Sequence, residues 1–142
     1  MSRKLAREVA FKVVFSTNFQ SEKDEIENLI LSLLKESEEE LTDEDKKYIN
    51  DVAFGVVKNS EVLDKVITSH LKGWKMDRIG KTDLAILRVA LYEIIYRKDI
   101  PYKVSINEAV ELAKLFCDDS SPSFINGVLA GAFNEFNEEK NK

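Results

Sequence analysis

Hydrophobic residues recur at helical spacing through most of the chain, and no stretch shows the alternation typical of a strand. The most apolar stretch is TDLAILRVALYEIIY, residues 82–96, which begins with the cap signal Thr82-Asp83 and then contains only two charges, Arg88 and Glu93. A helix that is apolar nearly all round is buried nearly all round. At about 15 residues it is shorter than the roughly 20 needed to cross a bilayer. The pattern therefore predicts the central helix of an all-α bundle.

Six further helices are expected around it. The first runs from about Arg3 to Phe19, and an acidic loop at about 35–44 follows the second. Cap signals mark where later helices begin. They are Thr42-Asp43-Glu44-Asp45, Asn59-Ser60, the capping box Ser105-Ile106-Asn107-Glu108, and Ser121-Pro122. The helix after Thr42 is expected to bury Tyr48, Ile49, Val52 and Val56. The expected inward positions of the last two helices are Ile106, Ala109, Val110, Ala113 and Phe116, then Ile125, Val128, Leu129, Ala132 and Phe136.

The composition fits one domain, residues 1–142, with a frayed tail at 137–142. The single cysteine, Cys117, excludes an intramolecular disulfide, and no secretory signal or membrane span is expected. A cytoplasmic protein is the resulting expectation. Gly127 and Gly131, four residues apart, offer a groove for internal helix packing or for a dimer face, so the free protein is expected to be a monomer or a homodimer.

The net charge of −5 is unevenly distributed. Residues 21–47 contain eleven acidic residues and four lysines, whereas residues 1–20 and 65–81 are basic. Two basic patches therefore remain available for a polyanion despite the overall charge.

The first basic patch lies on one side of the first helix, where Arg3, Arg7, Phe11, Phe15 and Phe19 follow one another at intervals of four. In one interpretation the aromatic rings pack in the core and the arginines are solvated. In the other the arginines bind phosphates and an exposed ring stacks on a base.

The second patch follows the only histidine, His70, and includes Lys72 and Lys75 beside Trp74. A lysine run beside an indole is compatible with RNA binding, although Trp74 can equally cover the core, and His70 can be a half-buried residue at a helix end. No second histidine is present and Cys117 is distant in sequence, so no metal site is expected. No glycine-rich phosphate loop or nucleophile motif occurs either, which predicts no enzyme and no cofactor.

Arg88 is the residue of the central helix that requires a partner, because burying an unpaired cation costs several kcal/mol. One expectation is an ion pair with an acid of another helix, such as Asp51, Asp64 or Glu108. The alternative places Arg88 at the rim of the helix, where its guanidinium could bind a phosphate or a partner.

Two segments carry a resemblance to a known family. LRVALYEIIYRKDIPYKVSINEAVELAKLF, residues 87–116, and FINGVLA, residues 124–130, resemble the NusB family of transcription antitermination factors, and residues 3–8 look like that family's basic first helix. The resemblance implies a seven-helix fold of two small three-helix subdomains with one further short element, and no enzymatic activity. It also implies binding of boxA, a single-stranded element of ribosomal RNA transcripts, together with the ribosomal protein NusE, in a complex with other Nus factors on RNA polymerase.

The resemblance carries over to particular positions of this chain. The residues it implies for RNA are Arg3, Lys4, Arg7, Phe15, His70, Arg88, Phe124 and Asn126, and Asp83 is implied in the complex with NusE. Relatives often have three consecutive arginines in the first helix, and Ser120, Ser123 and Ala130 also depart from the usual residues. Two other functions are open: a targeting domain for a separate RNA-modifying methyltransferase, and a helical bundle that binds only proteins.

Overall fold

Seven helices and no strand are found in the residues that the structure describes. The computed structural model describes residues 2–17, 21–37, 40–71, 73 and 78–140, of which 2, 37 and 136–140 are described by their backbone alone. The helices are α1 (Ser2–Ser16), α2 (Lys23–Ser37), α3 (Asp43–Lys58), α4 (Ser60–Ser69), α5 (Lys81–Tyr96), α6 (Tyr102–Phe116) and α7 (Ser121–Lys140). The all-α prediction is confirmed.

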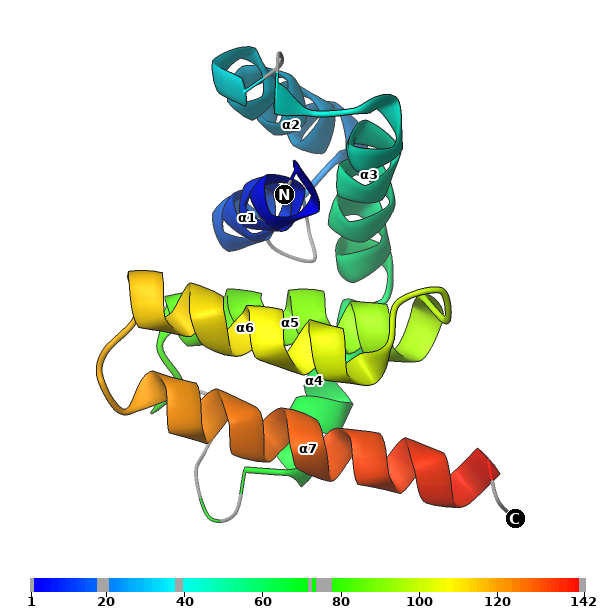
Figure 1. Ribbon diagram of the computed structural model, residues 1–142, viewed down its shortest axis with the longest axis vertical. Helices are drawn as coiled ribbons and strands as arrows, with labels where there is room; N and C mark the ends of the chain where they lie inside the picture. Colours follow the sequence, from blue (N-terminus) through cyan, green and yellow to red (C-terminus); the bar gives the residue numbers. More distant parts are fainter. Residues whose placement is uncertain (1, 18–20, 38–39, 72, 74–77, 141–142) are drawn as a thin grey trace. The chain divides into compact units, whose positions relative to one another are not determined.

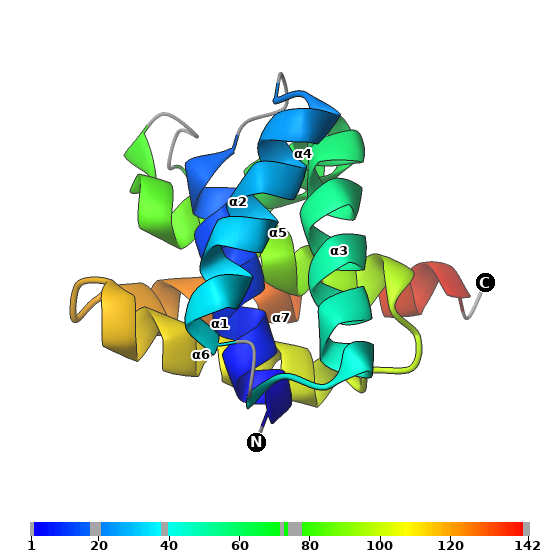
Figure 2. The same ribbon diagram turned by 90° about the horizontal axis from the view of Figure 1, so that it is seen from above.

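The chain forms two units, Met1–Ser60 and Glu61–Lys142. In the first, α1 packs against both α2 and α3, as Figures 1 and 2 show. The expected inward residues of α3, which are Tyr48, Ile49, Val52 and Val56, are all buried. The capping box of this helix is confirmed, since the Thr42 hydroxyl accepts from the Asp45 amide at 3.1 Å and the Asp45 carboxylate accepts from the Thr42 amide at 3.3 Å.

The second unit is built around α5, which packs against α6 and α7, while α6 and α7 lie side by side (Figure 1). Nine residues of α5 are buried, so the prediction of a central helix is confirmed. Its predicted cap is wrong. The N-cap is Gly80, which has no side chain to offer, and the Asp83 carboxylate accepts hydrogen bonds from Ser121 instead.

The capping box predicted at Ser105 is also wrong. Helix α6 begins at Tyr102 after Pro101, and Ser105 is buried one turn inside it. The Ser105 hydroxyl donates to Glu93 Oε1 of α5 at 2.9 Å, and Glu93 is completely buried. The pattern failed because a serine that satisfies a buried carboxyl group on another helix has the same local sequence as a serine that caps its own helix.

Most of the other expected inward positions of α6 and α7 are buried. Phe116 is an exception, because it is the last residue of α6 and is 40% exposed, while the buried line passes through Leu112 and Ala113. Helix α1 ends at Ser16, three residues before the predicted end at Phe19, which lies outside the described residues, as do Trp74 and the side chain of Phe136.

Candidate nucleic-acid interface

The arginines of α1 are held by groups of α3. The Arg3 guanidinium lies 4.7 Å from the centre of the Tyr48 ring, and its Nε donates to Asp45 Oδ1 at 3.1 Å. Arg7 lies over the same ring, at 5.7 Å, and only 5% of it is exposed. A cation over an aromatic face is stabilised by the ring's quadrupole. Arg3 remains partly accessible, whereas Arg7 is positioned to support the packing of α1 on α3.

The remaining expected residues of α1 differ in exposure. Lys4 is exposed at the start of the helix. Phe15 is half-buried, with its ring centre 6.4 Å from that of Phe11, and Phe11 is buried. Of the two interpretations of the arginine and phenylalanine stripe, packing therefore accounts for Arg7 and Phe11. Lys4 is exposed and Arg3 and Phe15 are partly exposed, so RNA binding by these three residues stays a prediction.

His70 follows the C-terminal end of α4 and contacts α7. Its Nε2 lies 2.7 Å from Glu135 Oε2, and its side chain is 21% exposed. Gly131 explains how the ring fits, since a Cβ at that position would lie 2.9 Å from His70 Nδ1. A Cβ at Gly127 would contact nothing within 4 Å, so only Gly131 serves the internal packing expected for the pair. Lys72 and Lys75 lie outside the described residues.

Arg88 forms the ion pair expected from its setting. Its Nε and Nη2 donate to the two oxygens of Asp64, on α4, at 2.9 and 2.8 Å. The side chains are 19% and 30% exposed, so the pair lies at the margin of the central helix and not in its core. The expected ion pair is therefore confirmed with Asp64, and binding of a phosphate or a partner by Arg88 stays a prediction.

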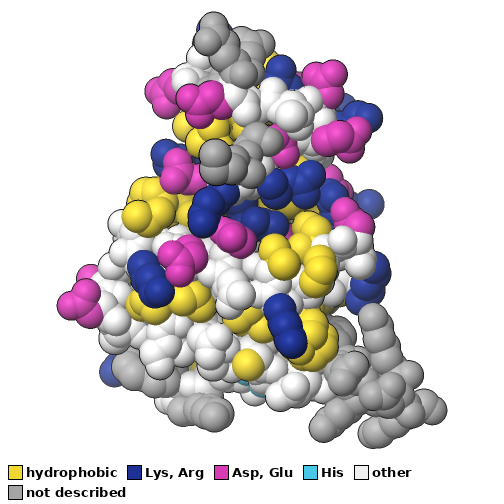
Figure 3. Space-filling model, in the orientation of Figure 1, with side chains coloured by type: hydrophobic (Ala, Val, Ile, Leu, Met, Phe, Trp, Pro, Cys, Tyr) yellow, Lys and Arg dark blue, Asp and Glu magenta, His cyan; other side chains and the backbone are white. Residues whose placement is uncertain are grey.

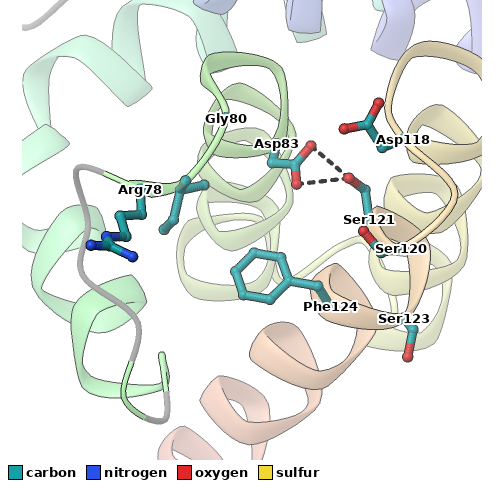
Figure 4. Close-up of a pocket in the computed structure, with 9 residues that line it drawn as sticks. Arg78, Gly80, Asp83, Asp118, Ser120, Ser121, Ser123 and Phe124 are labelled. Atoms are coloured by element: carbon teal, nitrogen blue, oxygen red, sulfur yellow. Dashed lines mark hydrogen bonds between the residues drawn. The ribbon is translucent and has the colours of Figure 1, made fainter.

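Asp83 and Phe124 line one pocket of about 650 Å³, drawn in Figure 4. Phe124 points from α7 towards the Arg78–Gly80 side, and the Ser121 hydroxyl donates to both Asp83 oxygens, at 3.0 and 2.8 Å. The other lining residues are Ile79, Asp118, Ser120 and Ser123. An aromatic face beside hydroxyl and carboxylate groups can stack on a planar ring and accept hydrogen bonds from it.

Residues that line this pocket also set the chemistry of the neighbouring Cys117. Burial, a hydrogen bond to Asp83 and repulsion from Asp83 and Asp118 raise the pKa of the Cys117 thiol to about 12, against a smaller opposing effect of Ser121. The thiol therefore stays protonated near neutral pH, where it is a poor nucleophile. Asn126, the last expected RNA residue, is exposed on α7.

The residues that contact the expected site residues are not predicted from the sequence. Tyr48 and Glu135 carry no signal beyond an apolar position and an acidic helix end. Asp45 stands out in the sequence only as a cap, and Ser121 only as the start of a helix. On the face drawn in Figure 3, acidic and basic side chains lie next to one another at several places. Local pairing of this kind cannot be seen in a charge count.

The described part of the chain has no group of three or more His, Cys, Asp or Glu side chains that could hold a metal ion. Within the same residues, every helix is too short or too polar to cross a membrane.

Comparison with known proteins gives one consistent result. The model of the NusB family matches residues 4–133. The transcription antitermination protein NusB of Acetivibrio thermocellus is 48% identical over 129 residues, which cover 91% of this chain and 86% of that protein. NusB of Bacillus pumilus is 40% identical over 139 residues, which cover 98% and 100%.

Solved structures agree with the sequence matches. A structure of T. maritima NusB aligns with a TM-score of 0.83 and 29% identity over 95% of this chain and 92% of that one. A chain of the crystal structure of antitermination factors NusB and NusE in complex with dsRNA aligns with a TM-score of 0.80 and 25% identity, over 94% and 97%. With a family match along nearly its whole length and the same fold, this chain belongs to the NusB family of transcription antitermination proteins.

Proposed function

We propose that this protein is a non-enzymatic, cytoplasmic antitermination factor that binds boxA-type single-stranded RNA together with ribosomal protein NusE, and acts with other Nus factors on RNA polymerase. The observation that carries the proposal is the alignment of 94% of this chain with a chain of a NusB–NusE complex with dsRNA. The exposed amide of Asn126 and the partly exposed ring of Phe124 add support, since they are groups that contact unstacked bases.

The expected RNA residues have different parts in this proposal. Lys4 and Asn126 are exposed and make direct contacts. Arg7 is 5% exposed and acts by supporting α1. Asp83, a hydrogen-bond acceptor in the pocket with Phe124, is the expected contact for the complex with NusE. Lys72 and Lys75 stay predictions from the sequence alone.

The test is a titration of a labelled boxA-containing RNA with the full chain, with and without NusE, at two salt concentrations. We expect modest affinity for the chain alone, higher affinity with NusE, and a loss of affinity as salt rises because phosphate contacts release counterions. A double-stranded RNA of the same length is the competitor, because the related complex contains dsRNA. Preference for the duplex would overturn the single-strand part of the proposal.

Matched variants locate the surface. Lys4→Ala should weaken binding and make the dependence on salt less steep by about 0.7, the contribution of one single-strand phosphate. Lys23→Ala removes the same charge from an exposed position of α2 and is its control. Asn126→Ala should weaken binding to boxA more than to a scrambled RNA, and Asn50→Ala, an exposed amide of α3, is its control. Equal effects of each variant and its control would refute the assignment.

Two other results would identify a different function. Recovery of an RNA methyltransferase and no NusE in a pull-down with the full chain would favour a targeting domain. Equal affinity for boxA and for an unrelated polyanion would favour a bundle that binds only proteins.

A further inference from the structure

Two hydrogen bonds join the Arg88 guanidinium to the Asp64 carboxylate. The guanidinium meets the carboxylate through the Nε side, with Nε on one oxygen and Nη2 on the other, at 2.9 and 2.8 Å. Two parallel hydrogen bonds fix the plane of the guanidinium as well as its distance. The orientation of Arg88 is therefore set by Asp64, which projects from a different helix.

This arrangement leaves part of the guanidinium unused. Arginine has five N–H donors, of which Asp64 takes two. Nη1 has no hydrogen bond to any described residue. Among the described residues, every buried side-chain nitrogen has a hydrogen-bond partner. Because Nη1 has none, it is not buried but accessible to solvent, in agreement with the 19% exposure of the Arg88 side chain. Nη1 and the outer N–H of Nη2 thus form a second fork that faces away from Asp64.

We propose that Asp64 is a positioning residue for RNA binding: it holds the Arg88 guanidinium so that Nη1 and the outer N–H of Nη2 bind one phosphate of the RNA. This inference rests on the proposed function and adds a residue to it. A phosphate matches the fork because its oxygens accept two parallel N–H bonds, as a carboxylate does. Holding the side chain in advance also removes most of the rotamer entropy that Arg88 would otherwise lose on binding.

A purely neutralising role of Asp64 predicts the opposite effect on affinity. If the carboxylate only neutralises Arg88, then its removal frees a cation and RNA binds more tightly. If it positions Arg88, its removal weakens binding although the net charge becomes more favourable. Asp64→Asn distinguishes the two, because the amide keeps one acceptor oxygen but turns an NH₂ group towards the guanidinium.

The chain provides a matched control. Arg97 and Asp99, in the segment after α5, form the same fork, from Nε at 3.0 Å and from Nη2 at 2.9 Å. Asp99→Asn therefore changes the charge equally and breaks the same kind of pair, at a place where no RNA contact is proposed.

The experiment measures the affinity of the full chain with NusE for boxA-containing RNA over a series of salt concentrations. Asp64→Asn should bind about tenfold more weakly, the effect of losing a charge-assisted contact. Its salt dependence should be less steep by about 0.7, the contribution of one phosphate. Asp64→Glu should recover part of the affinity, and Asp99→Asn should match the wild type. Unchanged or tighter binding by Asp64→Asn overturns the inference.

A double-mutant cycle separates positioning from a general structural effect. In an Arg88→Gln background, Asp64→Asn should have little further effect, since Asp64 acts through Arg88. If Arg88→Gln does not fold, Arg88→Lys serves, because it keeps the charge and loses the fork. Additive losses overturn the inference. Failure of the wild-type complex to bind the RNA at all would instead overturn the proposed function.

Discussion

Ser105 has a different role in the structure from the one that its local sequence predicts. Its hydroxyl donates to Glu93 Oε1 at 2.9 Å, and both residues are at most 1% exposed. Ser105→Ala removes this donor and leaves a buried carboxyl oxygen with one bond fewer. Leaving a buried acceptor without a hydrogen-bond donor costs about 1–3 kcal/mol. We therefore expect a loss of about 2 kcal/mol in the free energy of unfolding, or a fall of about 7 °C in melting temperature for a chain of this length.

Ser105→Asp is the sharper variant. At a helix N-cap, Asp is as good as Ser, so a capping role predicts little change. In the structure, the introduced carboxyl group would lie beside that of Glu93 in a site without solvent, at a cost of about 3 kcal/mol or more.

The measurement is thermal and urea unfolding followed by circular dichroism. Ser69→Ala is the control, because Ser69 is exposed and donates to a backbone carbonyl of its own helix, so its effect should be within about 0.5 kcal/mol. Wild-type stability of Ser105→Asp would refute the assignment of Ser105 to Glu93.

Three further outcomes are expected. The raised pKa of Cys117, about 12 against an ordinary value of 9.0, predicts slow alkylation of the native thiol by iodoacetamide up to pH 9, faster alkylation in urea, and a faster native reaction in Asp83→Asn. The pKa of Cys117 is higher in the folded protein than in the unfolded chain, so its contribution to the free energy of unfolding is complete below pH 9 and is lost as the pH rises from 9 towards 12. Urea unfolding at a series of pH values measures this loss. Gly131→Ala should lower the melting temperature, because its Cβ would lie 2.9 Å from His70 Nδ1, whereas Gly127→Ala should raise the free energy of unfolding by about 0.5–1 kcal/mol, since nothing lies within 4 Å. Arg7→Ala should destabilise the protein by more than about 1 kcal/mol in urea unfolding, because it removes a buried side chain from the Tyr48 ring, and Lys4→Ala should leave the melting temperature unchanged.

The sequence was sufficient to predict the helices and most of the buried core residues. Periodicity alone located α5 as a buried helix, and the residues expected to face inward on α3 are all buried. This works because burial of an apolar face is decided along one helix, at a spacing that the chain repeats. Phe116 is an exception, because helical spacing extends the inward face to the last residue of α6, which is 40% exposed in the structure.

The sequence was not sufficient to predict the hydrogen-bond and ion-pair partners of polar side chains. Ser105 and Ser121 both stand in cap patterns, and both donate to a carboxylate of α5 instead. Asp64 was one of three candidate partners for Arg88, and no spacing rule could choose among them. Such pairs depend on which helices pack together and on their relative positions along the helix axes, and both are properties of tertiary packing.

Pairing of the basic residues has a consequence for the proposed RNA binding. Arg3 donates to Asp45 and Arg88 to Asp64, so two of the expected phosphate-binding groups already have a carboxylate partner, in a chain whose net charge is −5. Each phosphate that approaches them meets a nearly neutral pair, and the long-range attraction that a free arginine would exert is reduced. Affinity must then come from directional contacts held in place, to which Asp64 contributes, and from a partner that adds surface. We therefore expect the dependence on NusE to be strong in this protein.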